Sequence, residues 1–220
     1  EVGLFSMTEA GLGELSDPSS VFLVRRDGNA PAGSAVAATW EGTRCLLVEI
    51  QALTVPGKAA MSRVYSERVE PARVARVAAV LEKHAGIRLS DQDLYVNVAG
   101  GIRLAEPGID LALAAALYSA RSGLALPAAT ALAGELSLAG EVRPVARMRG
   151  RARAARALGF TRIYGPADAA AIPTTTPTAT ASTVTASAAT QKAVPPAEDP
   201  ESWEALPGIV GAIKILFDGH

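Results

Sequence analysis

The chain has 220 residues, of which 49% are apolar and 20% charged, and its formal net charge is -1. At this length a chain buries about 70% of the surface that it exposes when unfolded, which predicts one main domain with appendages. A net charge so close to zero argues against a generally basic nucleic-acid binder and against an acidic, solvating protein. Any charge-driven function therefore has to come from local clusters.

Cys45 is the only cysteine, which leaves no internal disulfide and no cysteine-pair zinc site, and fits a reducing cytosol. We interpret it as a small buried residue on a strand. No apolar run reaches the ~20 residues that a membrane-spanning helix needs, so we expect a soluble, cytoplasmic protein. Because the chain opens on Glu1 rather than Met, we expect it to be a piece of a longer protein.

The first part of the chain predicts a hairpin, a short helix and two strands. Residues 2–15 alternate and turn at glycines, and Asp17 with Pro18 is a typical helix start. Residues 33–55 contain two strand-like runs joined by "EGT". The second run, "CLLVEIQALTV", is too continuously apolar for a solvated strand, which predicts a central one.

Helices and strands then alternate. An amphipathic helix is predicted between Pro71 and Gly86, because Val74, Val77, Ala78 and Leu81 recur at helical spacing. A strand at 93–100, an almost wholly apolar helix at 107–123, a hairpin-like pair at 129–145, a helix near 148–160 and a strand at 161–168 complete the series. This alternation predicts an α/β or α+β fold in two layers.

The composition changes after residue 168. We predict a domain at 1–168, a disordered Thr/Ala/Pro-rich linker at 169–201, and a short amphipathic tail at 202–220. The apolar residues of the tail recur at near-helical spacing, although Pro207 and Gly208 break its first turn. The tail could dock, on the domain or on a partner, or it could fray.

The usual catalytic motifs are weak or missing. The sequence has no G-x-x-x-x-G-K-[ST] motif, so we expect no P-loop nucleotide site in this chain. Its only histidines are His84 and His220, which makes a Ser-His-Asp triad improbable. We interpret His84 as a solvated residue at the negative end of a helix.

The segments "VAGGIRLAEPGIDLALAAAL" and "ALAGELSLAGEVRPVARMRGRARAARALGFTRIYGPAD" resemble the proteolytic domain of Lon-type peptidases. The resemblance implies a Lon proteolytic-domain-like fold of the ribosomal protein S5 domain 2-like type. In that family a serine after the proline is the nucleophile, and a lysine near the start of the later helix is its base. These positions fall on Gly108 and Arg149. Glycine offers no nucleophile, and a guanidinium cannot act as a base near neutral pH.

A longer resemblance covers about residues 1–168. The segments "EVGLFSMTEAGLGELSDPSSVFL", "EGTRCLLVEIQALT" and "LYVNVAGGIRLAEPGIDLALA" are similar to the C-terminal domain of the bacterial RadA (Sms) family. This implies the non-proteolytic scaffold and DNA-binding domain of an ATP-dependent, hexameric motor in homologous recombination, branch migration and DNA repair. Its implied partners are single-stranded or branched DNA and a RecA-type recombinase. The implied ATP, Mg and Zn belong to upstream domains, so we expect no cofactor and no enzyme activity in this chain.

An arginine cluster supports DNA contact independently. Seven arginines and no acidic residue lie between positions 143 and 162: Arg143, Arg147, Arg149, Arg151, Arg153, Arg156 and Arg162. On a helix, Met148, Ala152 and Ala155 share a packing face, whereas Arg149, Arg153 and Arg156 share another. We interpret this cluster as a phosphate-binding surface. A solvated face and contact with acidic groups of a neighbouring subunit are the alternatives.

A weaker basic group consists of Arg63, Arg68, Arg73 and Arg76, interrupted by Glu67 and Glu70. DNA or subunit contact and a solvated face are equally supported for it. Glu106 and Asp110 flank the position of the missing nucleophile, and we interpret them as favourable charges on the first turn of the following helix. Arg103 could reach a neighbouring subunit.

Three hypotheses remain at this stage. The first is a DNA-binding scaffold domain of a recombination motor, and the second is a hexamerisation module that binds only protein. The third is a peptidase with a non-standard nucleophile, such as Ser62 or Ser137.

Overall fold

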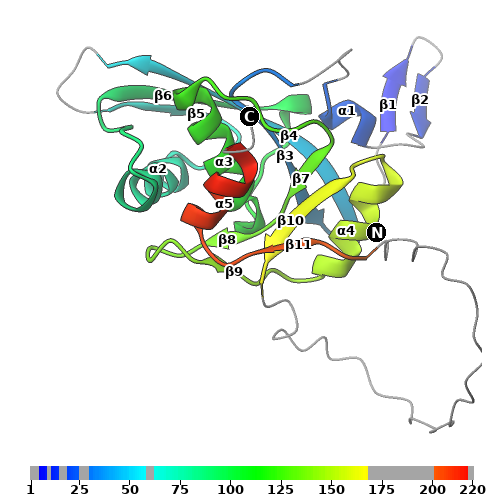
Figure 1. The fold of residues 1–220 in the computed structure, drawn as a ribbon. Helices are drawn as coiled ribbons and strands as arrows, with labels where there is room; N and C mark the ends of the chain where they lie inside the picture. Colours follow the sequence, from blue (N-terminus) through cyan, green and yellow to red (C-terminus); the bar gives the residue numbers. More distant parts are fainter. Residues whose placement is uncertain are drawn as a thin grey trace, which may run out of the picture.

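The computed structural model describes residues 5–8, 11–14, 19–24, 30–57, 62–167 and 201–217. Its centre is a mixed seven-stranded sheet in the order β11-β10-β7-β3-β4-β6-β5 (Figure 1). β3 pairs antiparallel with β4 and β4 with β6, whereas the other neighbours run parallel. The strands are β3 (Ser34–Glu41), β4 (Arg44–Pro56), β5 (Val64–Ser66), β6 (Gln92–Val98), β7 (Thr130–Leu132), β10 (Arg162–Pro166) and β11 (Glu204–Leu206). The α/β class is confirmed.

β4 has apolar side chains on both faces, which confirms its prediction as a central strand. Leu46, Val48 and Ile50 belong to the larger core, beneath α2 (Pro71–Ala85), α3 (Asp110–Ser122) and α5 (Ile209–Phe217). Leu47 points to the opposite face and joins a second core beneath α4 (Met148–Ala157). The prediction of two layers is therefore incomplete, because α4 adds a partial third layer.

α2 begins and ends as the sequence predicts, whereas α3 starts after a 3-10 turn and α4 ends at Ala157, before the predicted residue 160. In α2, Pro71 lies in the first turn, and Gly86 caps the end in the left-handed conformation with φ 69°. α3 is buried almost all round because its alanines allow close approach to β3 and β4. The 3-10 turn η2 (Pro107–Ile109) leads directly into α3, so the N-terminus of this helix is held against the sheet.

The predicted hairpin-like pair at 129–145 divides into two parts. β7 enters the main sheet between β3 and β10, and only β8 (Glu135–Leu136) and β9 (Val142–Arg143) form a hairpin. At the N-terminus, β1 (Phe5–Thr8) and β2 (Gly11–Glu14) pair antiparallel before α1 (Ser19–Phe22), as predicted. Asp17 and Pro18, the predicted helix start, lie outside the described residues.

The C-terminal segment packs on the rest of the chain. β11 extends the sheet by pairing parallel with β10, in a register that places Tyr164 opposite Glu204. α5 packs on α2 and α3, and the rings of Phe217 and Tyr118 lie 4.9 Å apart. Of the two roles considered for this segment, the structure shows docking on the domain. Apart from Glu201, the predicted linker lies outside the described residues.

No helix in the described part of the chain is long and apolar enough to cross a membrane.

Candidate nucleic-acid interface

Gly108 lies in η2, between the end of β6 and the start of α3, and is buried. A Cβ atom added to it would lie 3.2 Å from Oε1 of Glu106 and 3.3 Å from Nη1 of Arg151. These two side chains therefore form the wall of the position where the Lon resemblance places a nucleophile.

Glu106 and Arg151 form a buried ion pair with many hydrogen bonds. The Arg151 guanidinium donates to both carboxylate oxygens of Glu106 and, through Nη1, to the carbonyl of Ala38 at 2.6 Å. Glu106 also accepts hydrogen bonds from the Thr39 hydroxyl at 2.8 Å and the Trp40 amide at 2.7 Å. Burial alone would raise the pKa of the Glu106 carboxyl, but the hydrogen bonds from Arg151 and Trp40 outweigh it and lower the pKa.

This geometry corrects the assignment of the general-base position. The arginine that faces Gly108 is Arg151, whereas Arg149 points away with 77% of its side chain exposed. The two residues lie about 200° apart around α4, so only one of them can face the sheet. Arg151 was also predicted to contact DNA, and this prediction is wrong for the described conformation because its side chain is fully buried.

Asp110 forms the second buried charge cluster. Its side chain is fully buried and accepts hydrogen bonds from Arg76 at 2.7 Å, Arg73 at 3.2 Å and the Leu136 amide at 3.3 Å. Both arginines also donate to backbone carbonyls, Arg73 to Ala105 and Glu106 and Arg76 to Leu136. These two arginines are therefore structural, and their prediction as DNA contacts is corrected.

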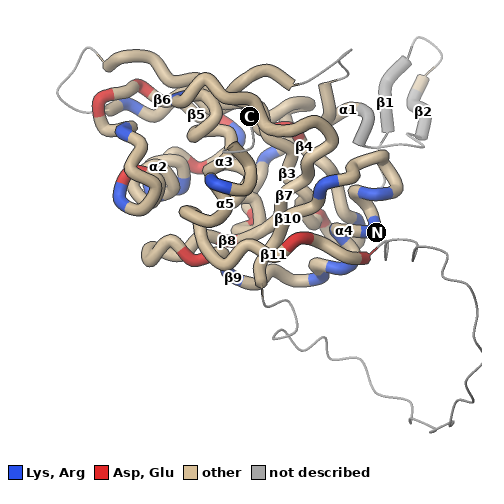
Figure 2. The backbone as a smooth tube through the Cα atoms, viewed as in Figure 1, with Lys and Arg blue, Asp and Glu red and all other residues tan. Residues whose placement is uncertain are grey.

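The remaining arginines between positions 143 and 162 lie on α4 or on the segments that precede and follow it, and Figure 2 shows several basic positions around this helix. We call them the α4 arginine surface: Arg143, Arg147, Arg149, Arg153, Arg156 and Arg162. Arg149 and Arg153 are 77% and 67% exposed, as expected for groups that can meet a phosphate. The predicted common face of Arg149, Arg153 and Arg156 is consistent with their shared neighbours, Glu201 and Ser202.

Neighbouring groups hold several of these side chains in place. Arg147 has the left-handed φ of 57° and lies over the Trp40 ring, 4.8 Å from its centroid. Arg162 donates to the Ala128 carbonyl at 3.1 Å, and Arg143 lies opposite Glu135 in the β8–β9 register. Cation–π contact orients Arg147 without neutralising its charge.

Glu201 is the acidic neighbour that sequence reasoning missed. Its carboxylate lies 3.0 Å from Arg153 and 4.0 Å from Arg149. The segment between positions 168 and 201 has no sequence pattern which predicts that the chain after it packs beside α4. The contact of Glu201 with these arginines could therefore not be predicted from the sequence. Both pairs are largely exposed and are screened by salt, so they leave the surface available to a competing phosphate.

The other predicted polar sites have structural partners. His84 is half-buried and bonds through Nε2 to the Leu138 carbonyl at 2.9 Å, which corrects its interpretation as a solvated residue. Ser62 donates to the Gln92 carbonyl, and the Ser137 hydroxyl lies 3.3 Å from Oε2 of Glu141. Burial raises the pKa of the Cys45 thiol to about 11, so the thiol stays protonated at neutral pH. Arg103 is exposed.

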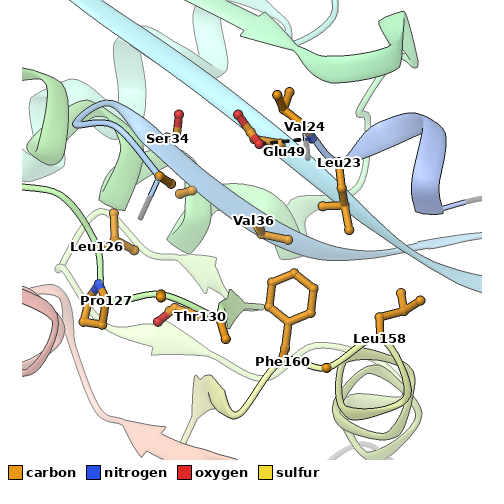
Figure 3. A pocket seen from close by; sticks show the side chains of 15 residues that line it. Leu23, Val24, Ser34, Val36, Glu49, Leu126, Pro127, Thr130, Leu158 and Phe160 are labelled. Carbon is orange, nitrogen blue, oxygen red and sulfur yellow. Dashed lines mark hydrogen bonds between the residues drawn. The ribbon is translucent and has the colours of Figure 1, made fainter. Parts of the chain in front are cut away.

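A hollow of about 310 Å³ lies between β3, β7 and the end of α4 (Figure 3). Apolar side chains dominate its wall, among them Val36, Leu158 and Phe160. Its acidic group, Glu49, accepts hydrogen bonds from the Val24 amide and the Gln51 side chain. The described lining contains no lysine or histidine that could activate a nucleophile. In the described part of the chain, no cluster of three His, Cys, Asp or Glu side chains could hold a metal ion.

A family model described as "Subunit ChlI of Mg-chelatase" matches residues 57–169, which are 113 of the 220 residues. The chain belongs to this ChlI family. The matched residues, 57–169, begin just after β4. They include the Gly108 turn, both buried charge clusters and the α4 arginine surface.

The chain is also similar in sequence to DNA repair proteins. It is 53% identical over 166 residues to the DNA repair protein RadA of Treponema pallidum, and 44% identical over 167 residues to that of Escherichia coli. Both comparisons cover 76% of the chain but only 36% of the relative. The chain thus spans about a third of the length of these relatives.

Proposed function

We propose that this chain is a non-proteolytic scaffold and DNA-binding domain of a RadA-like, ATP-dependent motor that acts in DNA repair, homologous recombination and branch migration. The observation that carries the proposal is the α4 arginine surface, where the exposed guanidinium groups of Arg149 and Arg153 lie on a helix whose opposite side packs on the sheet. The relatives, which are DNA repair proteins named RadA, support the same function.

The α4 arginine surface suits phosphate binding for electrostatic reasons. Arginine presents several N–H donors in a planar fork that matches phosphate oxygens. Each phosphate that a cation neutralises releases counterions and adds about 0.9 to the salt dependence of binding. Glu201 partly balances Arg149 and Arg153 in the free protein, so bound DNA has to displace this carboxylate.

The Gly108 turn supports the non-proteolytic part of the proposal, which includes a Lon proteolytic-domain-like fold. A serine-lysine mechanism needs a hydroxyl and a base that can become neutral. Here the corresponding positions hold a glycine and a buried guanidinium, which stays protonated. The proposed role of the framework is to hold α3 and α4 in place.

The full proposed assembly extends beyond this chain. We propose a hexameric ring as the working form, with a RecA-type recombinase as its protein partner. ATP and Mg would bind to an upstream ATPase core and Zn to an upstream zinc finger. In this arrangement the chain contributes DNA contact and ring contact, whereas the upstream domains perform ATP hydrolysis.

The test replaces Arg143, Arg149 and Arg153 together by glutamine and measures binding of a branched DNA by fluorescence anisotropy. A matched control replaces Lys83, Arg88 and Arg103, which are exposed away from α4, so it removes the same net charge. We expect at least tenfold weaker binding in the first variant and a small change in the control. Equal losses of DNA affinity in both variants would contradict the assignment of the α4 arginine surface as the DNA-binding site.

A protein-only hexamerisation module is the second candidate. It is favoured by the outer side of α5, where Val210 and Ile215 are 46% and 42% exposed. Sedimentation of the chain with and without branched DNA separates this candidate from the first, because a protein-only module forms hexamers that never shift DNA. Labelling of Ser62 or Ser137 by a serine-directed probe would instead support the peptidase candidate.

A further inference from the structure

A row of exposed apolar and aromatic side chains crosses three strands at one end of the sheet. Leu53 on β4 lies opposite Tyr95 on β6, and Tyr95 lies beside Tyr65 on β5. These side chains are 58%, 39% and 43% exposed, respectively. We call them the tyrosine row. Large contiguous apolar groups on an open sheet face commonly mark an interaction site.

The two tyrosine rings are stacked on each other. Their centroids lie 4.6 Å apart and their planes differ by 10°. Alternate residues of β6, Leu94 and Val96, belong to the core beneath α2 and α3 on the opposite face (Figure 1). The strand register therefore holds both rings upright and in parallel, with Tyr95 between Tyr65 and Leu53, so the outer face of Tyr65 on the edge strand is the flat π surface that the row presents.

A groove of about 1020 Å³ runs along this row, and polar groups flank it. Arg68 lies in its wall, and Arg63, whose side chain interacts with Tyr65, is a second cation near the ring pair. The acidic groups of the same region are Glu67 and Asp93, and the carboxylate of Asp93 accepts the Arg63 amide at 3.0 Å.

The far end of the groove is formed by side chains and backbone that suit base recognition. The Asn97 amide donates to the Gln51 amide at 3.2 Å, which leaves further donors and acceptors of this pair for a ligand. Ala99, Gly100 and Gly101 continue the wall. Gly100 packs against Phe22, whereas the space beside Gly101 is open except for the guanidinium of Arg68, so a phosphate can approach this end of the groove.

We propose that the tyrosine row and its groove bind single-stranded DNA. A base would stack on the outer face of Tyr65, the next base would lie along the exposed edges of Tyr95 and Leu53, and Arg63 and Arg68 would meet the phosphates. Stacking on aromatic side chains favours single strands, because bases within a duplex already have both faces covered. The inference rests on the proposed function for its ligand, but it concerns a surface distinct from α4.

The test compares oligo(dT) of about 15 nucleotides with a duplex of the same length, because a site on one small domain covers about that many nucleotides. The double variant Tyr65→Leu/Tyr95→Leu keeps an apolar row but removes the aromatic faces. Tyr65→Phe/Tyr95→Phe is the matched control, because it keeps the rings and loses only the hydroxyls. Circular dichroism and thermal melting show whether each variant is folded.

We expect the leucine variant to lose about tenfold in oligo(dT) affinity, with duplex affinity changed less than twofold, and the phenylalanine variant to bind like the wild type. Equal oligo(dT) binding by the leucine variant, or no oligo(dT) binding by the wild type, overturns the inference. The inference is also overturned if the wild type forms an oligomer without DNA and the leucine variant does not. The tyrosine row would then be a contact between copies of the chain.

The two proposals fail in different ways. In one outcome, changing Arg143, Arg149 and Arg153 abolishes duplex binding, and the tyrosine changes have no effect on oligo(dT) binding. This outcome supports the α4 arginine surface and contradicts the tyrosine row as a binding site. The reverse pattern retains the tyrosine row and removes the α4 arginine surface.

Discussion

The guanidinium of Arg151 holds the carboxylate of Glu106 against the Cα atom of Gly108, beneath the N-terminal turn of α3. The pair joins α4 to the loop before α3 and, through Thr39 and Trp40, to β3. This charge pair links elements that are distant in the sequence and fills the space beside Gly108.

Replacing Arg151 by methionine should destabilise the chain strongly. The Glu106 carboxylate would lose its charged partner while remaining half-buried, a change that typically costs about 3–5 kcal/mol. Urea unfolding measures the loss. Arg149→Met is the matched control on the same helix and should change stability by less than about 0.5 kcal/mol because its side chain is exposed. Similar values for both variants would contradict the buried role of Arg151.

The ion pair also predicts a pH dependence. Because the folded-state pKa of Glu106 is below its ordinary value of 4.5, its stabilising contribution is fully present above pH 4.5 and is lost as pH falls through the folded-state value. Glu106→Gln removes this titration. We therefore expect the wild type to lose stability more steeply below pH 4.5 than the variant, as followed by urea midpoints. Parallel pH profiles would be inconsistent with a lowered pKa.

Gly108→Ser should fail to create a peptidase. The added Cβ would lie 3.2 Å from Glu106 and 3.3 Å from Arg151, so these side chains have to shift, and the guanidinium of Arg151 cannot accept a proton. We expect a modest loss of stability and no labelling by a serine-directed probe. Labelling of the Gly108→Ser variant at the introduced hydroxyl would show that a base is available at this turn.

Asp110→Asn should destabilise by about 3 kcal/mol, because Arg73 and Arg76 would keep their charges without a buried counter-charge. Asp91→Asn is a suitable control, since the Asp91 side chain is 46% exposed and contacts Arg88 at 3.9 Å and the Gln92 side-chain amide at 2.9 Å. Thermal melting compares the two. A loss in Asp91→Asn as large as that in Asp110→Asn would contradict the buried cluster.

Thr130→Val should raise stability by about 1 kcal/mol. Among the described residues, the hydroxyl of Thr130 is buried and has no hydrogen-bond partner, and removing such a group relieves its desolvation cost. Thr130→Ser keeps the hydroxyl and loses a methyl group, so it should destabilise instead. The urea midpoints of the two variants should move in opposite directions, and a shared direction would exclude an unpaired hydroxyl as the cause.

Sequence patterns predicted most helices and strands because each has a clear periodicity. β4 was placed at the centre from its continuous apolar run, and α4 from the packing stripe of Met148, Ala152 and Ala155. Arg151 lies within about 60° of Met148 on the same helix, so its inward direction was readable from the spacing. A charged Arg151 on the packing face of α4 indicates a buried partner of opposite charge, and Glu106 is the acidic residue that fills this role.

Other features depend on contacts that no local pattern contains. Glu201 reaches the α4 arginine surface after a segment without apolar periodicity, and β11 pairs with β10 across the same segment. The pairing of Asp110 with Arg73 and Arg76 depends on how α2 lies beside α3. Such contacts follow from tertiary packing, so sequence reasoning treated Arg73 and Arg76 as surface charges.

The measurement that tests the central claim most directly is the salt dependence of branched-DNA binding by the wild type and by the variant with Arg143, Arg149 and Arg153 changed to glutamine. If these arginines neutralise phosphates, the slope of log affinity against log salt should fall by about 0.9 for each lost contact, or by about 2–3 in total. The variant with Lys83, Arg88 and Arg103 changed should keep the wild-type slope. An unchanged slope in the first variant would contradict a DNA-binding role for the α4 arginine surface.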